Sequence, residues 1–150
     1  MNWKTILVPH DFSSSANHAA AIARDEAKLH GATIVLLHVI DLPPAFEPAS
    51  VVMPESTGAP ISIKDFALNS AEAHLADIVA RLGKDGVTAT SYTRIGNPVD
   101  EINRFVEEMK VDLIVMGTHG RTGLQHLLVG SVAERIVRSS TKPVLTVRHP

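Results

Sequence analysis

The sequence predicts an α/β fold: a single domain with an open five-stranded parallel sheet and helices on both faces. Short runs of apolar and β-branched residues alternate with longer segments whose apolar residues recur at helical spacing. This alternation continues along the whole length without an internal repeat. Strands that alternate with helices form parallel sheets through right-handed crossovers. The 150 residues, 45% of them hydrophobic, suffice for one domain, residues 1–150, with a substantial core.

The N-terminal part predicts two buried strands and one helix. Residues 5–8 form an apolar and β-branched run that ends at Pro9, and residues 33–40 form a second such run. Between them, small residues recur at helical spacing until Gly31 ends the pattern. Residues 11–14 supply the turn and the helix cap, and Asp11 is the default N-cap at such a place. Its position at a strand end makes a ligand contact the competing interpretation.

A proline-rich loop interrupts the pattern from residue 41 to residue 60 and contains five of the nine prolines. A loop of this length in a compact domain is either a functional lid or a disordered excursion, and the sequence leaves both open. The second helix starts after Ser62, with Asp65 three residues later as in a capping box. Its apolar residues continue to Leu82, and the helix is expected to end near Gly83 or Gly86.

The C-terminal part supplies three further strands. Residues 87–95 are more polar and alternate, which indicates a half-exposed edge strand. Asn97 followed by Pro98 predicts the start of the third helix. Residues 113–116 form the fourth, buried strand, and a glycine-containing loop leads from it to the fourth helix. Residues 143–147 form a fifth strand, which begins at a proline as the first strand position allows.

The loop from Gly117 to Ser131 predicts a phosphate-binding site. Its glycines at 117, 120 and 130 permit close approach of the backbone to a ligand. The first amides of the following helix have no internal partner and lie at the positive end of its dipole. Ser131 has an alternative role, because with Glu134 three residues later it forms a capping box that would occupy the same amides. If the first and fourth strands are neighbours, Asp11 and this loop face one crevice.

Composition excludes several classes of protein. A formal net charge of −2 gives no basis for a nucleic-acid partner. The chain has no cysteine, so it has no disulfides or thiolate metal sites, and this fits a cytoplasmic location. Neither a signal peptide nor an apolar run near the roughly 18 residues of a membrane helix is present. His119 and His126 lack a metal-ligand spacing, so no metal site is expected, and His38 is expected to be a hydrogen-bonded core residue.

These residues resemble the universal stress protein family. Gly117-x2-Gly120-x9-Gly130-Ser131 is similar to the family signature Gly-x2-Gly-x9-Gly-(Ser/Thr). Residues 8–13 (Val-Pro-His-Asp-Phe-Ser), 37–41 (Leu-His-Val-Ile-Asp) and 141–144 (Thr-Lys-Pro-Val) are also similar to family segments. The resemblance covers the chain except for the proline-rich loop. It implies the sheet order 3-2-1-4-5 of adenine nucleotide alpha hydrolase-like folds.

The resemblance also implies the ATP-binding branch of the family, with Mg²⁺ left open as a companion of ATP. Asp11 would contact the nucleoside, Val39 the adenine through its backbone, and Met116 and Gly117 the ribose. The phosphates would be bound by the loop and the start of the fourth helix, including Arg121. His10 is left out because its position varies in the family. The full set of implied nucleotide-binding residues is Pro9, Asp11, Val39, Met116, Gly117, His119, Gly120, Arg121, Gly130, Ser131 and Val132.

A homodimer is expected as well, through the C-terminal strand from Val144 to Arg148. As a short apolar edge, this strand would expose unpaired amides unless it paired with its symmetry mate. The expected function is that of an ATP-binding, nucleotide-dependent regulatory protein of the stress response. The alternative is a weak ATPase or a nucleotide-transferring enzyme. No catalytic residue is assigned, because the chain lacks the Gly-x4-Gly-Lys-(Ser/Thr) motif and a clear base. The sequence does not fit a phosphoreceiver domain, because such a domain needs a lysine after the fifth strand, whereas Lys142 precedes that strand.

Overall fold

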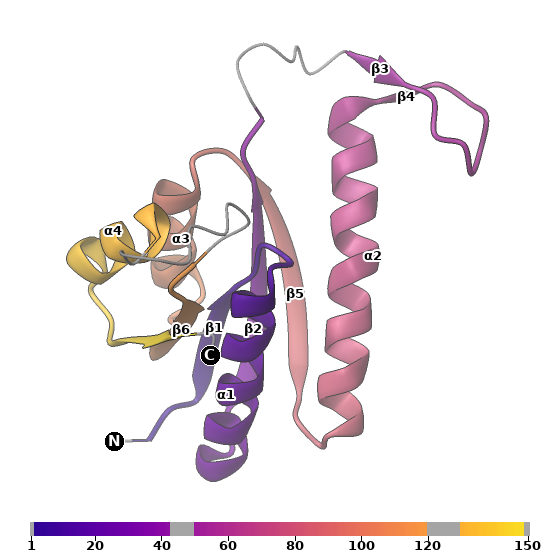
Figure 1. Ribbon diagram of the computed structural model, residues 1–150. Coiled ribbons are helices and arrows are strands. Elements are labelled where there is room, and N and C mark those ends of the chain that lie inside the picture. The colour runs from indigo at the N-terminus through magenta and orange to yellow at the C-terminus, as the bar shows by residue number, and fades with distance from the viewer. Residues whose placement is uncertain (1, 43–49, 120–129, 149–150) are drawn as a thin grey trace.

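A computed structural model describes residues 2–42, 50–119 and 130–148. Its main sheet has five parallel strands in the spatial order β5-β2-β1-β6-β7, with helices on both faces (Figure 1). Numbered within this sheet, the order is 3-2-1-4-5, so the predicted single-domain fold is confirmed. The strands are β1 (Thr5–Pro9), β2 (Thr33–Ile40), β5 (Ala89–Ile95), β6 (Leu113–Gly117) and β7 (Val144–Val147). The helices are α1 (Ser14–His30), α2 (Ile63–Lys84), α3 (Pro98–Glu108) and α4 (Ser131–Ser139).

Two apolar layers, one on each face of the sheet, form the core. Alternate residues of a strand point to opposite faces, so Ile6 and Val8 of β1 contribute to the layer under α1 and α2, whereas Leu7 contributes to the layer under α3 and α4. The alanine face of α1 is buried against the first layer and includes Ala19, Ala23 and Ala27. Phe105 is the largest fully buried side chain of the second layer. Because α1 carries small side chains there, it lies close to the strand ends.

Of three helix caps predicted from the sequence, two are confirmed and one is wrong. Ser62 caps α2 by accepting a hydrogen bond from the amide of Asp65 at 3.0 Å, and Asn97 caps α3, both as predicted. The default assignment of Asp11 as the cap of α1 is wrong. Ser13 is the N-cap, and its hydroxyl accepts from the amide of Ala16 at 3.1 Å. Two residues separate Asp11 from the helix, because the chain makes one further turn after β1.

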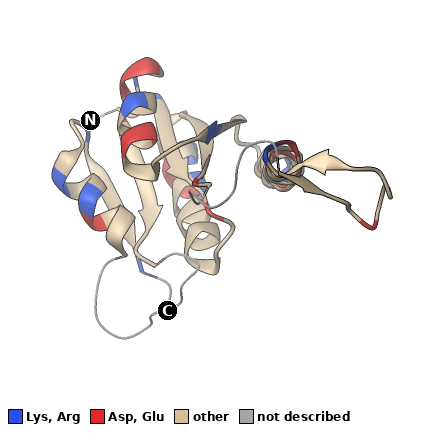
Figure 2. Ribbon diagram, turned by 90° about the horizontal axis from the view of Figure 1, so that it is seen from above, with Lys and Arg blue, Asp and Glu red and all other residues tan. Residues whose placement is uncertain are grey.

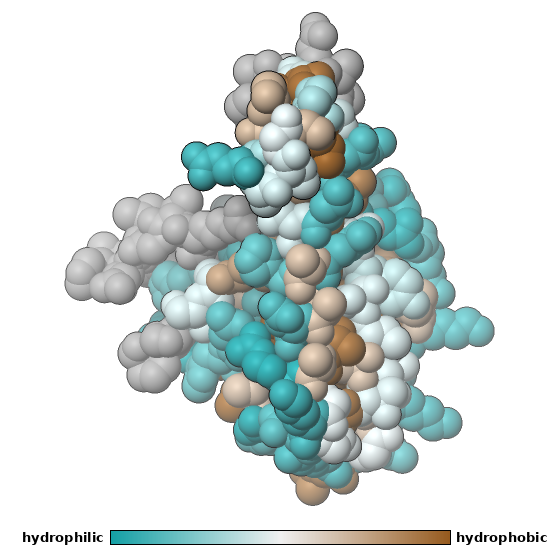
Figure 3. All heavy atoms as spheres, turned by 90° about the vertical axis from the view of Figure 1, so that its right-hand side faces the viewer, coloured by the Kyte–Doolittle hydropathy of each residue, from teal (hydrophilic) through white to brown (hydrophobic). Residues whose placement is uncertain are grey.

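A two-stranded antiparallel arm lies beyond the N-terminal end of α2 (Figure 1). It consists of β3 (Val51–Val52) and β4 (Ile61–Ser62), inside or next to the loop expected at 41–60. Strands of two residues are too short to produce a recognisable alternation, so the sequence did not predict them. Val51 and Met53 on the arm and Phe66 on α2 are exposed, and apolar atoms gather at the top of the face drawn in Figure 3. Residues 43–49 lie outside the described part.

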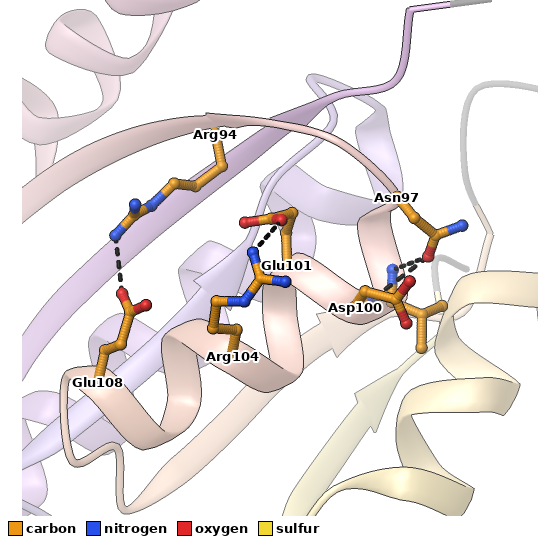
Figure 4. Close-up of polar contacts among 7 residues, drawn as sticks. Arg94, Asn97, Asp100, Glu101, Arg104 and Glu108 are labelled. Carbon is orange, nitrogen blue, oxygen red and sulfur yellow. Dashed lines mark hydrogen bonds and ion pairs between the residues drawn. The ribbon is translucent and has the colours of Figure 1, made fainter.

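Basic and acidic residues are both distributed along the described helices (Figure 2). Around α3 they form local pairs: Arg94 with Glu108 at 2.9 Å and Arg104 with Glu101 (Figure 4). Such exposed pairs contribute about 0–1 kcal/mol each. No helix among the described residues is long and apolar enough to cross a membrane.

Candidate functional site

A cavity of about 320 Å³ opens at the carboxyl ends of β1, β2 and β6. The strand order reverses at β1, which has β2 on one side and β6 on the other, and this is where open α/β sheets place their ligands. The volume lies at the lower end of the range for small-molecule sites, about 300–1,000 Å³. The walls also include the first turns of α1, α3 and α4. Three helix N-termini, each the positive end of a dipole, therefore converge on one cavity.

Nine of the eleven residues proposed from the sequence line this cavity. They are Pro9, Asp11, Val39, Met116, Gly117, His119, Gly130, Ser131 and Val132. The other two, Gly120 and Arg121, lie outside the described residues. The structure thus brings together positions that are more than 120 residues apart in the chain, because β1 and β6 are adjacent parallel strands that end at the same edge.

The exit of β6 is held tightly against α1. A Cβ added to Gly117 would lie 2.8 Å from the carbonyl carbon of Ser15 and 2.9 Å from its Cβ. No side chain fits in that space, so glycine is required here by close approach rather than by its backbone angles. Beyond it, the amide of Thr118 donates to the carbonyl of Val147, and the amide of Gly130 donates to the carbonyl of Thr118. These bonds bring the start of α4 back to the end of β6.

The first turn of α4 has no side-chain cap among the residues that the structure describes. Gly130 is the N-cap, and Ser131 is the first helical residue, with an exposed side chain. The alternative in which Ser131 and Glu134 form a capping box is therefore wrong. The chain enters the helix one residue earlier than that box requires, and Glu134 pairs with Arg138 at 2.9 Å instead. Among the described residues no side chain occupies the first amides of α4, which is the condition that the phosphate-site hypothesis requires.

Asp11 also lines the cavity and lies in the turn between β1 and α1. Its carboxylate oxygen Oδ1 accepts a hydrogen bond from the amide of Ser13 at 3.0 Å, which is an Asx turn. Phe12, between these two residues, has a φ of 66°, an uncommon backbone conformation for a bulky residue. Asp11 is the one carboxylate among the described residues that line the cavity.

His119 contributes an imidazole next to the start of the glycine loop. Its Nδ1 lies 2.9 Å from the hydroxyl of Thr118, which is buried. When that hydroxyl donates, Nδ1 is the acceptor and Nε2 carries the proton. His119 then offers an N–H donor, which suits contact with an anion and does not suit removal of a proton from water.

Sequence reasoning missed the wall that α3 supplies. Pro98 and Ile102 line the cavity, and both had been interpreted only as the start and the buried stripe of a helix. Asn97 fixes this helix start, since its side-chain oxygen accepts from the amides of Val99 and Asp100 (Figure 4). The available signal was topological: a helix that follows a parallel strand begins at the carboxyl edge of the sheet, where ligands bind.

His10 is buried, lines the cavity, and was left out of the predicted set. It is 3% exposed. Burial lowers the pKa of His10 to about 4, from an ordinary value of 6.5. Asp11 and the side chain of Asn17 act in the opposite direction, whereas His38 and Arg81 lower the pKa further. The ring is therefore neutral near pH 7. The predicted core role of His38 is confirmed, since it is buried and its Nδ1 lies 2.7 Å from the carbonyl oxygen of His10.

Fold and cavity together define a doubly wound α/β protein with a crevice at its topological switch point. The family model of the universal stress protein family matches residues 2–148. The chain therefore belongs to the universal stress protein family. It is 34% identical over 148 residues to the universal stress protein MJ0531 of Methanocaldococcus jannaschii, covering 99% of this chain and 84% of that protein.

Solved structures agree with this assignment. The structure of MJ0577 from the same organism has a TM-score of 0.84 and 31% sequence identity, over 100% of this chain and 99% of that one. A universal stress protein from Archaeoglobus fulgidus, solved in complex with dAMP, has a TM-score of 0.68 and 24% identity, over 97% of this chain and 98% of that one. At that identity the second likeness concerns the fold, and its nucleotide belongs to that protein.

Proposed function

We propose that this protein binds an adenine nucleotide, ATP above all, and acts as a nucleotide-dependent regulatory protein. The observation that carries the proposal is the first turn of α4, with Gly130 and Ser131, which no described side chain caps and which lines the same cavity as Asp11. An anion at a helix N-terminus gains charge-assisted hydrogen bonds of about 1.5–3 kcal/mol each. The dAMP complex of the Archaeoglobus fulgidus relative supports a nucleotide as the ligand.

The cavity offers a different chemistry to each part of a nucleotide. Pro98, Ile102 and Met116 form an apolar wall suited to a flat base. Asp11 has the acceptor oxygens that ribose hydroxyls need. The amides at the start of α4 suit phosphate, and His119 adds a donor beside them. In this arrangement the base lies toward β2 and α3, and the phosphates lie toward α4.

Mg²⁺ would enter this site with the phosphates. No cluster of three or more His, Cys, Asp or Glu side chains suited to a metal ion occurs within residues 2–42, 50–119 and 130–148. Magnesium commonly keeps several waters and binds through one or two carboxylates and substrate phosphates. The described residues therefore fit a metal carried by ATP and do not form a separate metal site.

Two copies of the chain would pair through β7. This strand lies at one edge of the sheet, and Leu145 on it is 37% exposed. The amide of Ile114 donates to the carbonyl of Pro143, and the amide of Thr118 donates to the carbonyl of Val147, each at 3.0 Å. Because hydrogen-bonding residues alternate along a parallel strand, the main-chain groups of Val144 and Thr146 face the open edge. A symmetry mate would satisfy them.

Native mass spectrometry of freshly purified protein tests the proposal, since it reports bound nucleotide and stoichiometry together. We expect a mass increase corresponding to an adenine nucleotide, and titration calorimetry that ranks ATP above GTP. Protein that binds neither ATP, ADP nor AMP at millimolar concentration would contradict it. Phosphate release addresses the enzyme alternative: turnover well above the buffer rate that is lost in Ser131→Ala would favour catalysis.

A further inference from the structure

The turn that carries Asp11 is anchored from the side of the sheet opposite α3 and α4. Along β1, Ile6 and Val8 point toward α1 and α2, and His10 continues that alternation. Along β2, Ile34 and Leu36 do the same, and His38 continues it. Both histidines are buried, at 3% and 7% exposure. They therefore lie under α1 and α2, directly behind the turn whose Asp11 faces the cavity.

Main-chain partners fix the proton positions on both rings. A backbone amide only donates, so Nδ1 of His10, at 3.1 Å from the amide of Phe12, is an acceptor without a proton. A backbone carbonyl only accepts, so Nδ1 of His38, at 2.7 Å from the carbonyl oxygen of His10, carries a proton and donates it. His10 is therefore neutral with its proton on Nε2. That atom is buried.

The two bonds act on consecutive peptide groups of one turn. His38 holds the carbonyl of His10, and the ring of His10 holds the amide of Phe12, so both peptide groups that flank Asp11 are fixed by imidazoles. The amide of His10 is bound in addition to the carbonyl of Leu37 at 2.8 Å. Both rings are buried, and the low dielectric of a protein interior strengthens hydrogen bonds there.

Phe12 shows that this turn needs such anchoring. Its φ of 66° lies in the left-handed region, which is unfavourable for a residue with a bulky side chain. Its ring packs against three histidines, with centroid distances of 5.4 Å to His10, 4.5 Å to His38 and 5.1 Å to His74 of α2. An unfavourable conformation persists only where its surroundings determine it, and such residues gather at functional sites.

We propose that His10 and His38 are positioning residues of the nucleotide site, which hold the turn at residues 10–13 so that Asp11 presents its carboxylate to the cavity. This inference rests on the proposed nucleotide function. Neither ring is assigned a contact with the nucleotide; each acts through the backbone on either side of Asp11. A neutral acceptor at His10 and a donor at His38 are the chemical requirements.

Substitutions that keep or remove the acceptor of His10 and the donor of His38 distinguish a positioning role of these residues from simple packing. His10→Asn places an amide oxygen near the position of Nδ1, and His10→Leu fills the space without an acceptor. His38→Asn keeps a donor near Nδ1, and His38→Leu removes it. Leu82→Ala is the control for lost stability, since it opens the core at the C-terminal end of α2, away from the cavity.

The experiment measures ATP affinity by calorimetry at pH 7, and hydrogen exchange of the Phe12 amide in the nucleotide-free protein. We expect the leucine variants to bind about tenfold more weakly or worse, because Asp11 is no longer held in place. Both asparagine variants and Leu82→Ala should stay within about threefold of the wild type. Exchange of the Phe12 amide should accelerate in His10→Leu and stay slow in His10→Asn.

The outcomes distinguish the positioning role of His10 and His38 from the proposed nucleotide binding. If His10→Leu binds ATP as the wild type does, the positioning role is wrong while the nucleotide site stands. If the asparagine variants lose as much affinity as the leucine variants, ring packing and not the named atoms holds the turn, which also overturns the proposal. If the wild type binds no nucleotide, the proposed function fails and the positioning role fails with it. The Phe12 exchange data then still show whether the hydrogen bond from its amide to His10 exists.

Discussion

Gly117 packs closely against Ser15: a Cβ on residue 117 would lie 2.8 Å from the carbonyl carbon of Ser15 and 2.9 Å from its Cβ. This contact presses the first turn of α1 onto the end of β6, just before the glycine loop. It places Asp11, four residues before Ser15, beside that loop. The geometry of the cavity therefore depends on the absence of a single methyl group.

Gly117→Ala should destabilise the protein and weaken nucleotide binding, because backbone atoms of α1 must move to admit the methyl group. Overpacking of this kind costs about 1–3 kcal/mol. The control is Gly83→Ala in α2, where an added Cβ meets nothing within 4 Å; alanine there should be neutral or stabilising by up to about 1 kcal/mol. Urea denaturation measures both. Equal midpoints for the two variants would show that α1 and β6 are not in close contact.

Ser131→Ala should weaken ATP binding by about tenfold while changing the free energy of unfolding by less than about 0.5 kcal/mol. The reason is that the Ser131 side chain makes no capping bond. Ser62→Ala is the matched control, since it removes the cap of α2 at a cost of about 1 kcal/mol and lies outside the cavity lining. Calorimetry and urea denaturation check the pair. A large loss of stability in Ser131→Ala would restore the capping role.

Gly130→Val should abolish nucleotide retention without unfolding the protein. Gly130 has φ −53° and ψ 150°, which any residue adopts, so the backbone tolerates the change. Valine instead adds bulk where phosphate must approach the amides of α4. Native mass spectrometry checks retention, and circular dichroism checks the fold. Nucleotide retained at the wild-type level would place the binding site elsewhere.

Thr146→Pro should convert a dimer to a monomer and leave the fold intact. The amide of Thr146 faces the open edge of β7, so proline removes a donor needed only for pairing with a second copy. Thr146→Val keeps that amide and should stay dimeric. Light scattering at micromolar concentration gives the masses. A wild-type monomer, or a dimeric proline variant, would exclude pairing through β7.

Stability should fall between pH 6.5 and pH 4 because of His10. Burial lowers its pKa in the folded protein to about 4, while the unfolded chain takes up a proton near 6.5. In that window the unfolded state binds more protons than the folded state. The contribution of His10 to the free energy of unfolding is therefore complete above pH 6.5 and is lost as the pH falls toward 4. The difference of about 2.5 pKa units corresponds to roughly 3 kcal/mol.

The matched variant for this prediction is His10→Asn, which does not titrate. The difference in free energy of unfolding between the wild type and this variant cancels the titration of other groups. We expect the difference to change steadily from pH 7 to pH 4, in the direction of a weaker wild type. A difference that stays constant over this range would mean that His10 titrates normally in the folded protein.

Most of the fold could be predicted, because its evidence is local. Apolar runs predicted four of the five sheet strands and an alternating, more polar run predicted β5, all to within two residues. The Ser62 and Asn97 caps followed from residue type. The caps near the cavity could not be predicted. Asp11 and Ser13 are both good caps, as are Gly130 and Ser131, and the choice within each pair depends on where the chain leaves β1 or β6. The arm formed by β3 and β4 was not predicted, because two-residue strands are too short to show an alternation of apolar and polar residues.

The sequence by itself determined the alternation of strands and helices, the glycine loop and the family, since hydrophobic periodicity and residue spacing are properties of the linear chain. Only the tertiary structure decided that nine proposed site residues line one cavity, that α3 supplies a wall of it, and that no described side chain caps α4. Those features depend on how parallel strands distant in sequence come to lie side by side. No pattern along the chain encodes the contact between Ser15 and Gly117 that sets the distance between two of the cavity walls.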